Sequence, residues 1–142
     1  MAILSKLMGD EVRANNNKVA KELEDFLIDQ EVVELAYKEF RDLSVFTNYR
    51  VILVDKKGMT GVKTIYHVIP YNSIVHFKIE SSGVAGHDHE IQLYIYGEKE
   101  PIKINISRGS KNLDLSQMVL ASHTCGLSIY EMKEPAILST QK

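Results

Sequence analysis

The sequence has few of the features that identify secreted or membrane-spanning proteins. A single cysteine, Cys125, occurs in 142 residues, so no internal disulfide can form and a reducing compartment is favoured. No apolar run reaches the length of a membrane span. The first residues, MAILSKLMGD, contain no basic segment followed by a long apolar one, as a secretion signal would. We therefore expect a cytoplasmic protein.

An excess of charge of one sign is also missing. The chain has 17 Lys and Arg residues against 19 Asp and Glu residues, so no global field attracts nucleic acid or anionic lipid, and any anion site must be local. A nucleophile elbow, a paired Cys–His signature and a Gly-rich phosphate loop are absent from the sequence as well. We predict one domain without enzymatic activity, cofactor or nucleic-acid partner.

The N-terminal part of the chain has the periodicity of helices. Apolar residues recur at helical spacing before Gly9, which is suited to end a short first helix. The polar run at 15–17 supplies capping chemistry for a second helix from about Lys18 to Asp29. We assign residues 1–30 to an N-terminal helical segment.

Period-two alternation replaces this pattern from Val32 onward. Val33, Leu35 and Tyr37 are predicted on one side of a strand, with Glu34 and Lys38 on the other. Turn-like segments then recur at 47–50, 55–58, 82–86 and 97–101. The intervals between them suit hairpins and are too short for crossover helices. The last two strands alternate most regularly, with Ile91, Leu93 and Ile95 in one and Ile102, Ile104 and Ile106 in the other.

A final helix is predicted from Asn112 to Thr124, where Gly126 is placed to end it in a left-handed turn. About seven antiparallel strands followed by one amphipathic helix indicate an α+β fold. We expect a strongly bent sheet or partly open β-barrel that the C-terminal helix plugs. This domain covers residues 31–125, and residues 126–142 form a partly flexible extension.

Two strands are apolar on both faces, at Val51–Val54 and at Ile65–Ile69. A small barrel has only one inner face, so the outer face must be covered by the N-terminal helices or by another subunit. A short terminal element gains most from a partner. The first helix is therefore the candidate oligomer interface, through Ile3, Leu4, Leu7 and Met8.

Residues 41–74, RDLSVFTNYRVILVDKKGMTGVKTIYHVIPYNSI, resemble the bacterial pleckstrin-homology-like (PH-like) domain family. The shared features are a hairpin of the form FTN-x-R-x-ILVDK-x-G-x-TGKK and a later IPY-x-SI, and a weaker likeness extends to about residue 122. Val62 departs from the pattern, because the family tends to have a basic residue there. The resemblance implies a seven-stranded barrel with a C-terminal helix, no enzymatic activity, and a ring-forming homo-oligomer larger than a dimer.

The basic residues of this hairpin are candidates for binding an anion or a lipid headgroup. Arg50, Lys56, Lys57 and Lys63 resemble the phosphoinositide-binding groups of eukaryotic PH domains, where basic side chains near hairpin loops hold phosphates. The same lysines also fit an ordinary solvated turn. Both interpretations stay open at this point.

The segment GHDHE contains the candidate metal ligands. His87 and His89 would project to the same side of a strand, and imidazole is a good zinc ligand. Two ligands do not complete a site, and a polar hairpin loop that tolerates histidines is the alternative.

These patterns favour a non-catalytic interaction or scaffolding module that acts as a homo-oligomer. A protein or peptide partner would bind its surface by addition to an open sheet edge. The first alternative is a peripheral membrane adaptor that uses Lys56, Lys57 and the N-terminal apolar helix. The second is a metal-binding protein that uses His87 and His89.

Overall fold

The computed structural model describes residues 2–39, 42–57, 63–81, 88–107 and 109–125, with side chains for all of these except residues 2–8 and Lys57. The predicted α+β architecture of helix, seven antiparallel strands and helix is confirmed. In chain order the elements are α1 (Ala2–Glu22), β1 (Val33–Glu39), β2 (Asp42–Thr47), β3 (Arg50–Lys57), β4 (Lys63–Pro70), η1 (Tyr71–Ser73), β5 (Ile74–Ser81), β6 (His89–Ile95), β7 (Ile102–Ile106) and α2 (Asn112–Thr124).

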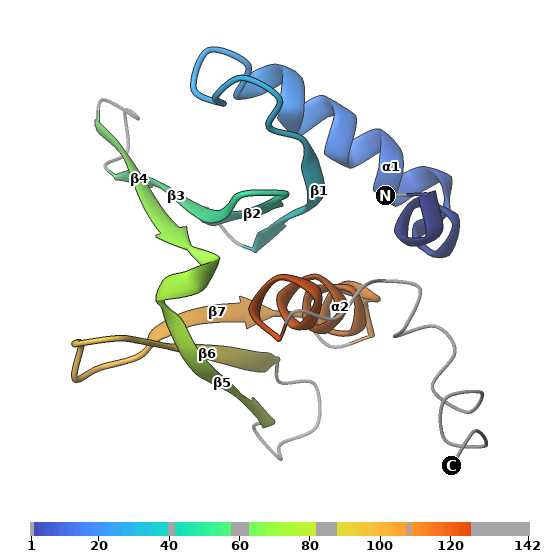
Figure 1. The fold of residues 1–142 in the computed structure, drawn as a ribbon. Coiled ribbons are helices and arrows are strands. Elements are labelled where there is room, and N and C mark those ends of the chain that lie inside the picture. The colour runs from blue at the N-terminus through green and yellow to red at the C-terminus, as the bar shows by residue number, and fades with distance from the viewer. Residues whose placement is uncertain (1, 40–41, 58–62, 82–87, 108, 126–142) are drawn as a thin grey trace.

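The strands form two antiparallel sheets that pack face to face (Figure 1). Sheet A has the order β1-β2-β3-β4 and sheet B the order β5-β6-β7, and η1 carries the chain from one to the other. Sequential pairing of this kind follows from the short turns. The main core lies between the sheets and against α2, and its fully buried members include Leu35, Phe46, Val51, Ile91 and Leu93.

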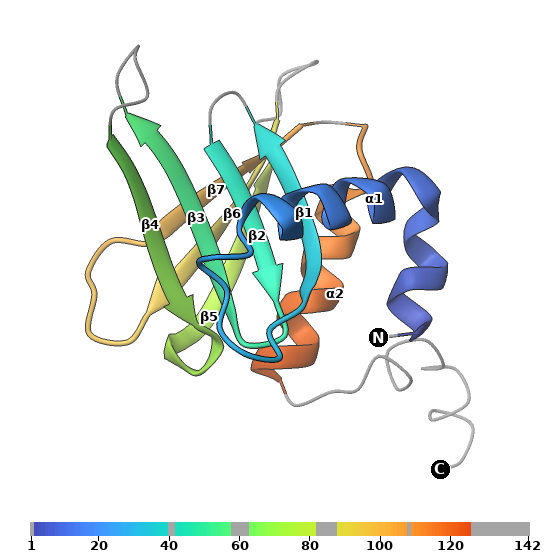
Figure 2. The ribbon, with the colours of Figure 1, turned by 90° about the horizontal axis from the view of Figure 1, so that it is seen from above.

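Helix α2 fills the space beside β1 (Figure 2) and has the bounds predicted from the sequence. Its buried residues include Leu115, Val119 and Leu120. Ser116 shares a hydrogen bond of 3.0 Å with the Tyr37 hydroxyl of β1. Burial raises the pKa of Tyr37, so this hydroxyl stays protonated and available for that bond. The predicted stop at Gly126 lies outside the described residues.

Helix α1 is kinked at Gly9, where φ is 79°, a value that L-residues with a side chain rarely adopt. The prediction that a first helix ends at Gly9 is confirmed. The predicted bounds of the second helix, about Lys18 to Asp29, are wrong, because helical structure runs from Asp10 to Glu22 and residues 23–26 form turns. The described part of the chain contains no helix with the length and apolarity of a membrane span.

The asparagines that we interpreted as capping residues instead cover the edge of sheet A. The Asn15 amide donates to the Ala36 carbonyl at 2.7 Å, and the Asn16 amide donates to the Glu34 carbonyl at 3.0 Å. In return, the Ala36 backbone N–H donates to the Asn16 side-chain oxygen at 2.8 Å. Side chains of α1 thus satisfy backbone groups that an edge strand would leave to water or to another strand.

A second apolar cluster lies on the outer face of sheet A, beneath α1. Val19 and Leu23 of the helical segment pack with six buried residues of the sheet: Val33, Ala36, Leu43, Val45, Ile52 and Val54. Strand β3 is therefore apolar on both faces, as predicted, and the chain itself supplies this part of the outer cover.

Two strands differ from the predicted pattern. In β1 a register shift separates Val33 from Leu35, so Val33 joins the outer cluster while Leu35 and Tyr37 face the main core. Strand β4 was predicted to be apolar and covered on both faces, but it is partly open to solvent on each, since Tyr66 is 41% exposed and Ile65 is 37% exposed. Strand β4 is the edge of sheet A, and the cover by α1 ends near it.

Candidate functional site

The four basic candidates divide between the two ends of β3. Lys56 and Lys57 lie at its end beside Lys63, which is the register partner of Lys57, and the side chains of Lys56 and Lys63 are exposed. Arg50 begins the same strand, about 23 Å away at the usual rise per residue. The structure thus groups the three lysines at one hairpin and separates Arg50 from them.

Arg50 instead binds the segment that joins α1 to β1. Its guanidinium makes two hydrogen bonds of 2.9 Å to the Glu31 carboxylate, and it lies over the Phe26 ring at 5.1 Å. The Thr47 hydroxyl donates to the same carboxylate at 2.6 Å. Burial acts to raise the pKa of Glu31, but the hydrogen bonds from Arg50, Thr47 and the Ile28 backbone outweigh it and lower the pKa. Arg50 is thus engaged in a structural ion pair, and its role as an anion ligand stays a prediction.

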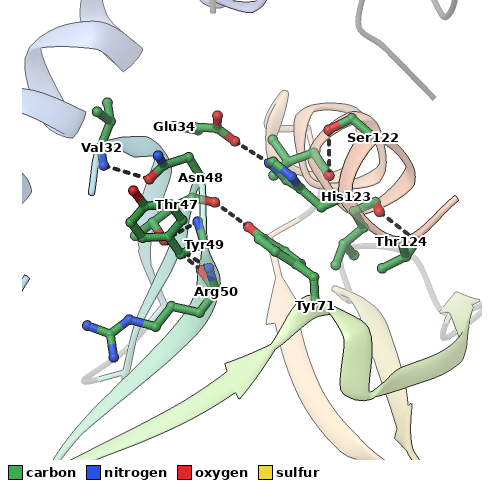
Figure 3. Close-up of polar contacts among 12 residues, drawn as sticks. Val32, Glu34, Thr47, Asn48, Tyr49, Arg50, Tyr71, Ser122, His123 and Thr124 are labelled. Atoms are coloured by element: carbon green, nitrogen blue, oxygen red, sulfur yellow. Dashed lines mark hydrogen bonds and ion pairs between the residues drawn. The ribbon is translucent and has the colours of Figure 1, made fainter. Parts of the chain in front are cut away.

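A polar cluster fixes the last turn of α2 to sheet A (Figure 3). His123 Nε2 lies 2.7 Å from Glu34 Oε1, and the His123 ring stacks on Tyr71 with ring centres 4.3 Å apart. The Tyr71 hydroxyl donates to the Thr47 carbonyl at 2.6 Å. Burial, together with the charges of Glu34 and Glu31, raises the pKa of Tyr71. Glu34, predicted on the side of the strand opposite Leu35 and Tyr37, is buried and in contact with His123.

Of the two candidate metal ligands, His89 lies within the described residues and His87 does not. His89 begins β6, and its Nδ1 is enclosed without a hydrogen-bond partner in the described part of the chain. His87 lies outside the described residues. Among the residues that are described, no three His, Cys, Asp or Glu side chains come together as metal ligands would. The hypothesis of a metal site at His87 and His89 stays a prediction.

The outer face of sheet B carries polar side chains that interact across its strands. The Gln92 amide donates to the carboxylates of Glu80 and Glu90, each at 2.8 Å. The Tyr94 ring stacks on His76 at 4.4 Å, and the Lys78 ammonium lies 5.3 Å from the centre of the Tyr94 ring. These contacts satisfy the polar groups of a sheet face that no helix in the described part of the chain covers.

Large apolar side chains are exposed on β5, one of the two edge strands of sheet B. Val75, at a register shift in β5, is 62% exposed, and Ile79 is 40% exposed. We did not single out either residue from the sequence, although a run such as IVHFKI signals a strand that presents apolar groups on more than one side. Exposed apolar groups on an edge strand favour contact with another chain.

The candidate interface residues Ile3, Leu4, Leu7 and Met8 lie in the helical segment before Gly9. Figure 2 shows this segment turning away from sheet A at the kink. Their backbone is helical, as predicted, and the structure does not describe their side chains.

A groove follows the edge of β4 on the side opposite α2. It contains two cavities of about 350 Å³ and about 330 Å³, and His67 lines both. Residues of β4, joined in the larger cavity by residues of β1, β2 and β3, form one wall, while β7 and the turn before it form the other. No local pattern of residues indicates this groove, because β4 and β7 on its two sides are about 35 residues apart in the chain.

Residues 2–124 match the model of the bacterial PH domain family. Two Bacillus subtilis (strain 168) proteins are similar to this chain, and both are described as uncharacterized. YjqA is 38% identical over 122 residues, which are 86% of this chain and 98% of YjqA. YozO is 33% identical over 108 residues, which are 75% of this chain and 90% of YozO.

Two solved structures have the same fold. A PH domain from Shewanella amazonensis SB2B is 42% identical with a TM-score of 0.68, and the match covers 86% of this chain and 98% of that one. A DUF1696 family protein with a PH domain from Shewanella loihica PV-4 is 38% identical with a TM-score of 0.69, covering 77% of this chain and 92% of that one. Both likenesses extend over nearly the whole of the related chain.

Proposed function

Since this chain belongs to the bacterial PH domain family, we propose that it is a non-catalytic interaction module that assembles into a closed homo-oligomer larger than a dimer. The observation that carries the proposal is the kink at Gly9. It directs a helical segment with four apolar residues at helical spacing away from the sheet that the rest of α1 covers. Such a segment gains most from packing on a neighbouring subunit.

A ring requires two different surfaces on each subunit. The segment before Gly9 supplies one, and the apolar edge of β5 at Val75 and Ile79 supplies the other. The edge of β1 is less suited to this role, because Asn15 and Asn16 already bond to its backbone. Two dissimilar apolar surfaces on one chain favour head-to-tail assembly over a two-fold dimer.

Size exclusion with light scattering tests this assembly. The native protein should have a mass several times the 16.1 kDa of the chain, and it should keep that mass in moderate salt because the contacts are apolar. Leu4→Glu with Leu7→Glu, and separately Val75→Lys with Ile79→Lys, should each give smaller species with an unchanged circular dichroism spectrum. Tyr49→Lys, at an exposed residue of the β2–β3 turn, is the matched control. A native monomer at all concentrations refutes the proposal.

A second candidate is a peripheral membrane adaptor, and one observation favours it. The register places Lys57 opposite Lys63 with Lys56 adjacent, and like charges across a strand pair are unfavourable unless an anion lies near them. Vesicles that contain phosphatidylserine should then bind the protein in low salt, and Lys56→Ala with Lys57→Ala should weaken that binding. Equal flotation of native and variant protein would remove this candidate.

A further inference from the structure

The groove along β4 has the properties of a peptide-binding site. β4 ends sheet A and pairs with β3, while β7 ends sheet B and pairs with β6, and neither has a second strand partner in the described chain. The two cavities lie between these edges. Groups on the free side of an edge strand can form a ladder with an added strand. The edge of β1 differs, since α1 occupies it.

The inner wall of the groove is apolar near its middle. Leu53 and Ile65 of sheet A and Ile104 of β7 line the larger cavity, with His67 at the junction of the two cavities. A strand added to β4 would direct every second side chain toward this wall. Aliphatic side chains of moderate size fit cavities of about 350 Å³ and about 330 Å³.

Carboxylates lie at both ends of the groove. At one end Glu39, Asp42 and Asp55 are successive register partners across β1, β2 and β3, and all three line the larger cavity. At the other end Glu98 and Glu100 line the smaller cavity. Among the described residues that line the two cavities, Lys103 is the one lysine, and there is no arginine. Glu39 already accepts hydrogen bonds from the Ser107 backbone and hydroxyl, but neighbouring carboxylates repel one another at both ends, so a cation there would be stabilised.

We propose that this groove binds an extended peptide segment of a partner protein, which adds to the free edge of β4. The segment carries aliphatic side chains toward Leu53, Ile65 and Ile104, with a Lys or Arg near each end. Ile65 to Pro70 spans about 17 Å of strand, so the two basic residues are about six or seven positions apart. The inference rests on the proposed interaction role but uses a surface separate from the β5 edge and from the segment before Gly9.

The probe is an acetylated peptide of about eight residues, with Lys at both ends and Val alternating with Thr between them. Titration into labelled protein, followed by NMR, should shift amide signals mainly in Lys63–Pro70 and Ile102–Ile106. The same peptide with Glu at both ends should bind at least about tenfold more weakly, because it meets like charges. N-methylation of alternate backbone amides should also reduce binding, since those groups form the ladder.

Variants of the groove carboxylates test the charge argument. Asp55→Asn and Glu98→Gln should each weaken binding of the Lys peptide about two- to fivefold, as expected for exposed charge pairs. Glu80→Gln, on the opposite edge of sheet B and still able to bond to Gln92, is the matched control and should change nothing. Circular dichroism verifies that each variant is folded.

Three results would overturn the inference: no binding of the Lys peptide at millimolar concentration, equal binding of the Lys and Glu peptides, or shifts confined to residues outside the groove. A fourth is slow hydrogen exchange of the β4 amides in the free protein that is lost on dilution, because a second copy would then occupy the groove. Light scattering on the same samples reports assembly independently, so failure of the homo-oligomer and failure of the peptide site are distinguishable.

Discussion

The outer faces of the two sheets of this PH domain differ in polarity and in whether a helix covers them. Sheet A presents Ala36, Val45 and Ile52 outward and buries them under α1. Sheet B presents Gln92, Tyr94 and their charged neighbours outward, and no helix of the described residues covers them. An apolar face needs a cover supplied by the fold, whereas a polar face is satisfied by water and cross-strand contacts. Stability should therefore depend far more on the outer face of sheet A.

The largest effect is expected from truncation beneath α1. Ile52→Ala removes a fully buried side chain between helix and sheet, which should lower the free energy of unfolding by about 2–5 kcal/mol. Lys103→Ala on the outer face of sheet B should change it by less than about 0.5 kcal/mol. Urea denaturation measures both. Equal losses in the two variants would contradict the comparison.

The edge contacts of α1 should have the next largest effect. Asn16→Ala leaves the Glu34 carbonyl and the Ala36 N–H without their side-chain partner, which should cost about 1–3 kcal/mol because buried backbone groups lose hydrogen bonds. Faster hydrogen exchange of the Ala36 amide, measured by NMR, identifies the cause. Lys18→Ala, at an exposed position of the same helix, should leave that exchange unchanged.

The ion pair at the end of this cover should make stability depend on pH. The folded-state pKa of Glu31 is lowered, so its contribution is present above the unfolded-state pKa of about 4.3 and is lost as pH falls through the folded value. Glu31→Gln should cost about 1–3 kcal/mol at neutral pH. Urea denaturation from pH 7 to pH 3 should show the native and variant curves converging in acid, and parallel curves would exclude Arg50–Glu31 as the cause. Glu24→Gln, an exposed neighbour, is the control.

The smallest effect is expected on sheet B. Tyr94→Ala removes the stack on His76 and the contact with Lys78, and cross-strand pairs of this kind contribute about 0.2–1 kcal/mol. Thermal denaturation should show a shift of a few degrees at most. A loss as large as that of Ile52→Ala would mean that sheet B also depends on a cover, supplied by a neighbouring subunit.

Regular elements of the fold could be predicted because their signals are local. The bounds of α2, the stop at Gly9 and the alternation of β6 and β7 follow from periods of 3.6 and 2 residues and from turn chemistry. The candidate sites were less predictable. The predicted hairpin places three of the four basic candidates together, at Lys56, Lys57 and Lys63. The groove and the exposed apolar residues of β5 do not follow from any single stretch of the chain.

The sequence by itself determined that this protein is a seven-stranded α+β domain with a C-terminal helix, since propensity and periodicity act over a few residues. The tertiary structure decided which side chains those elements use for contact. Glu34 is buried and in contact with His123, 89 residues away, and Arg50 is held by Glu31 from another element. Asn15 and Asn16 bond to an edge strand that follows them by about 20 residues. Such pairings depend on distances in space, which no local pattern of residues specifies.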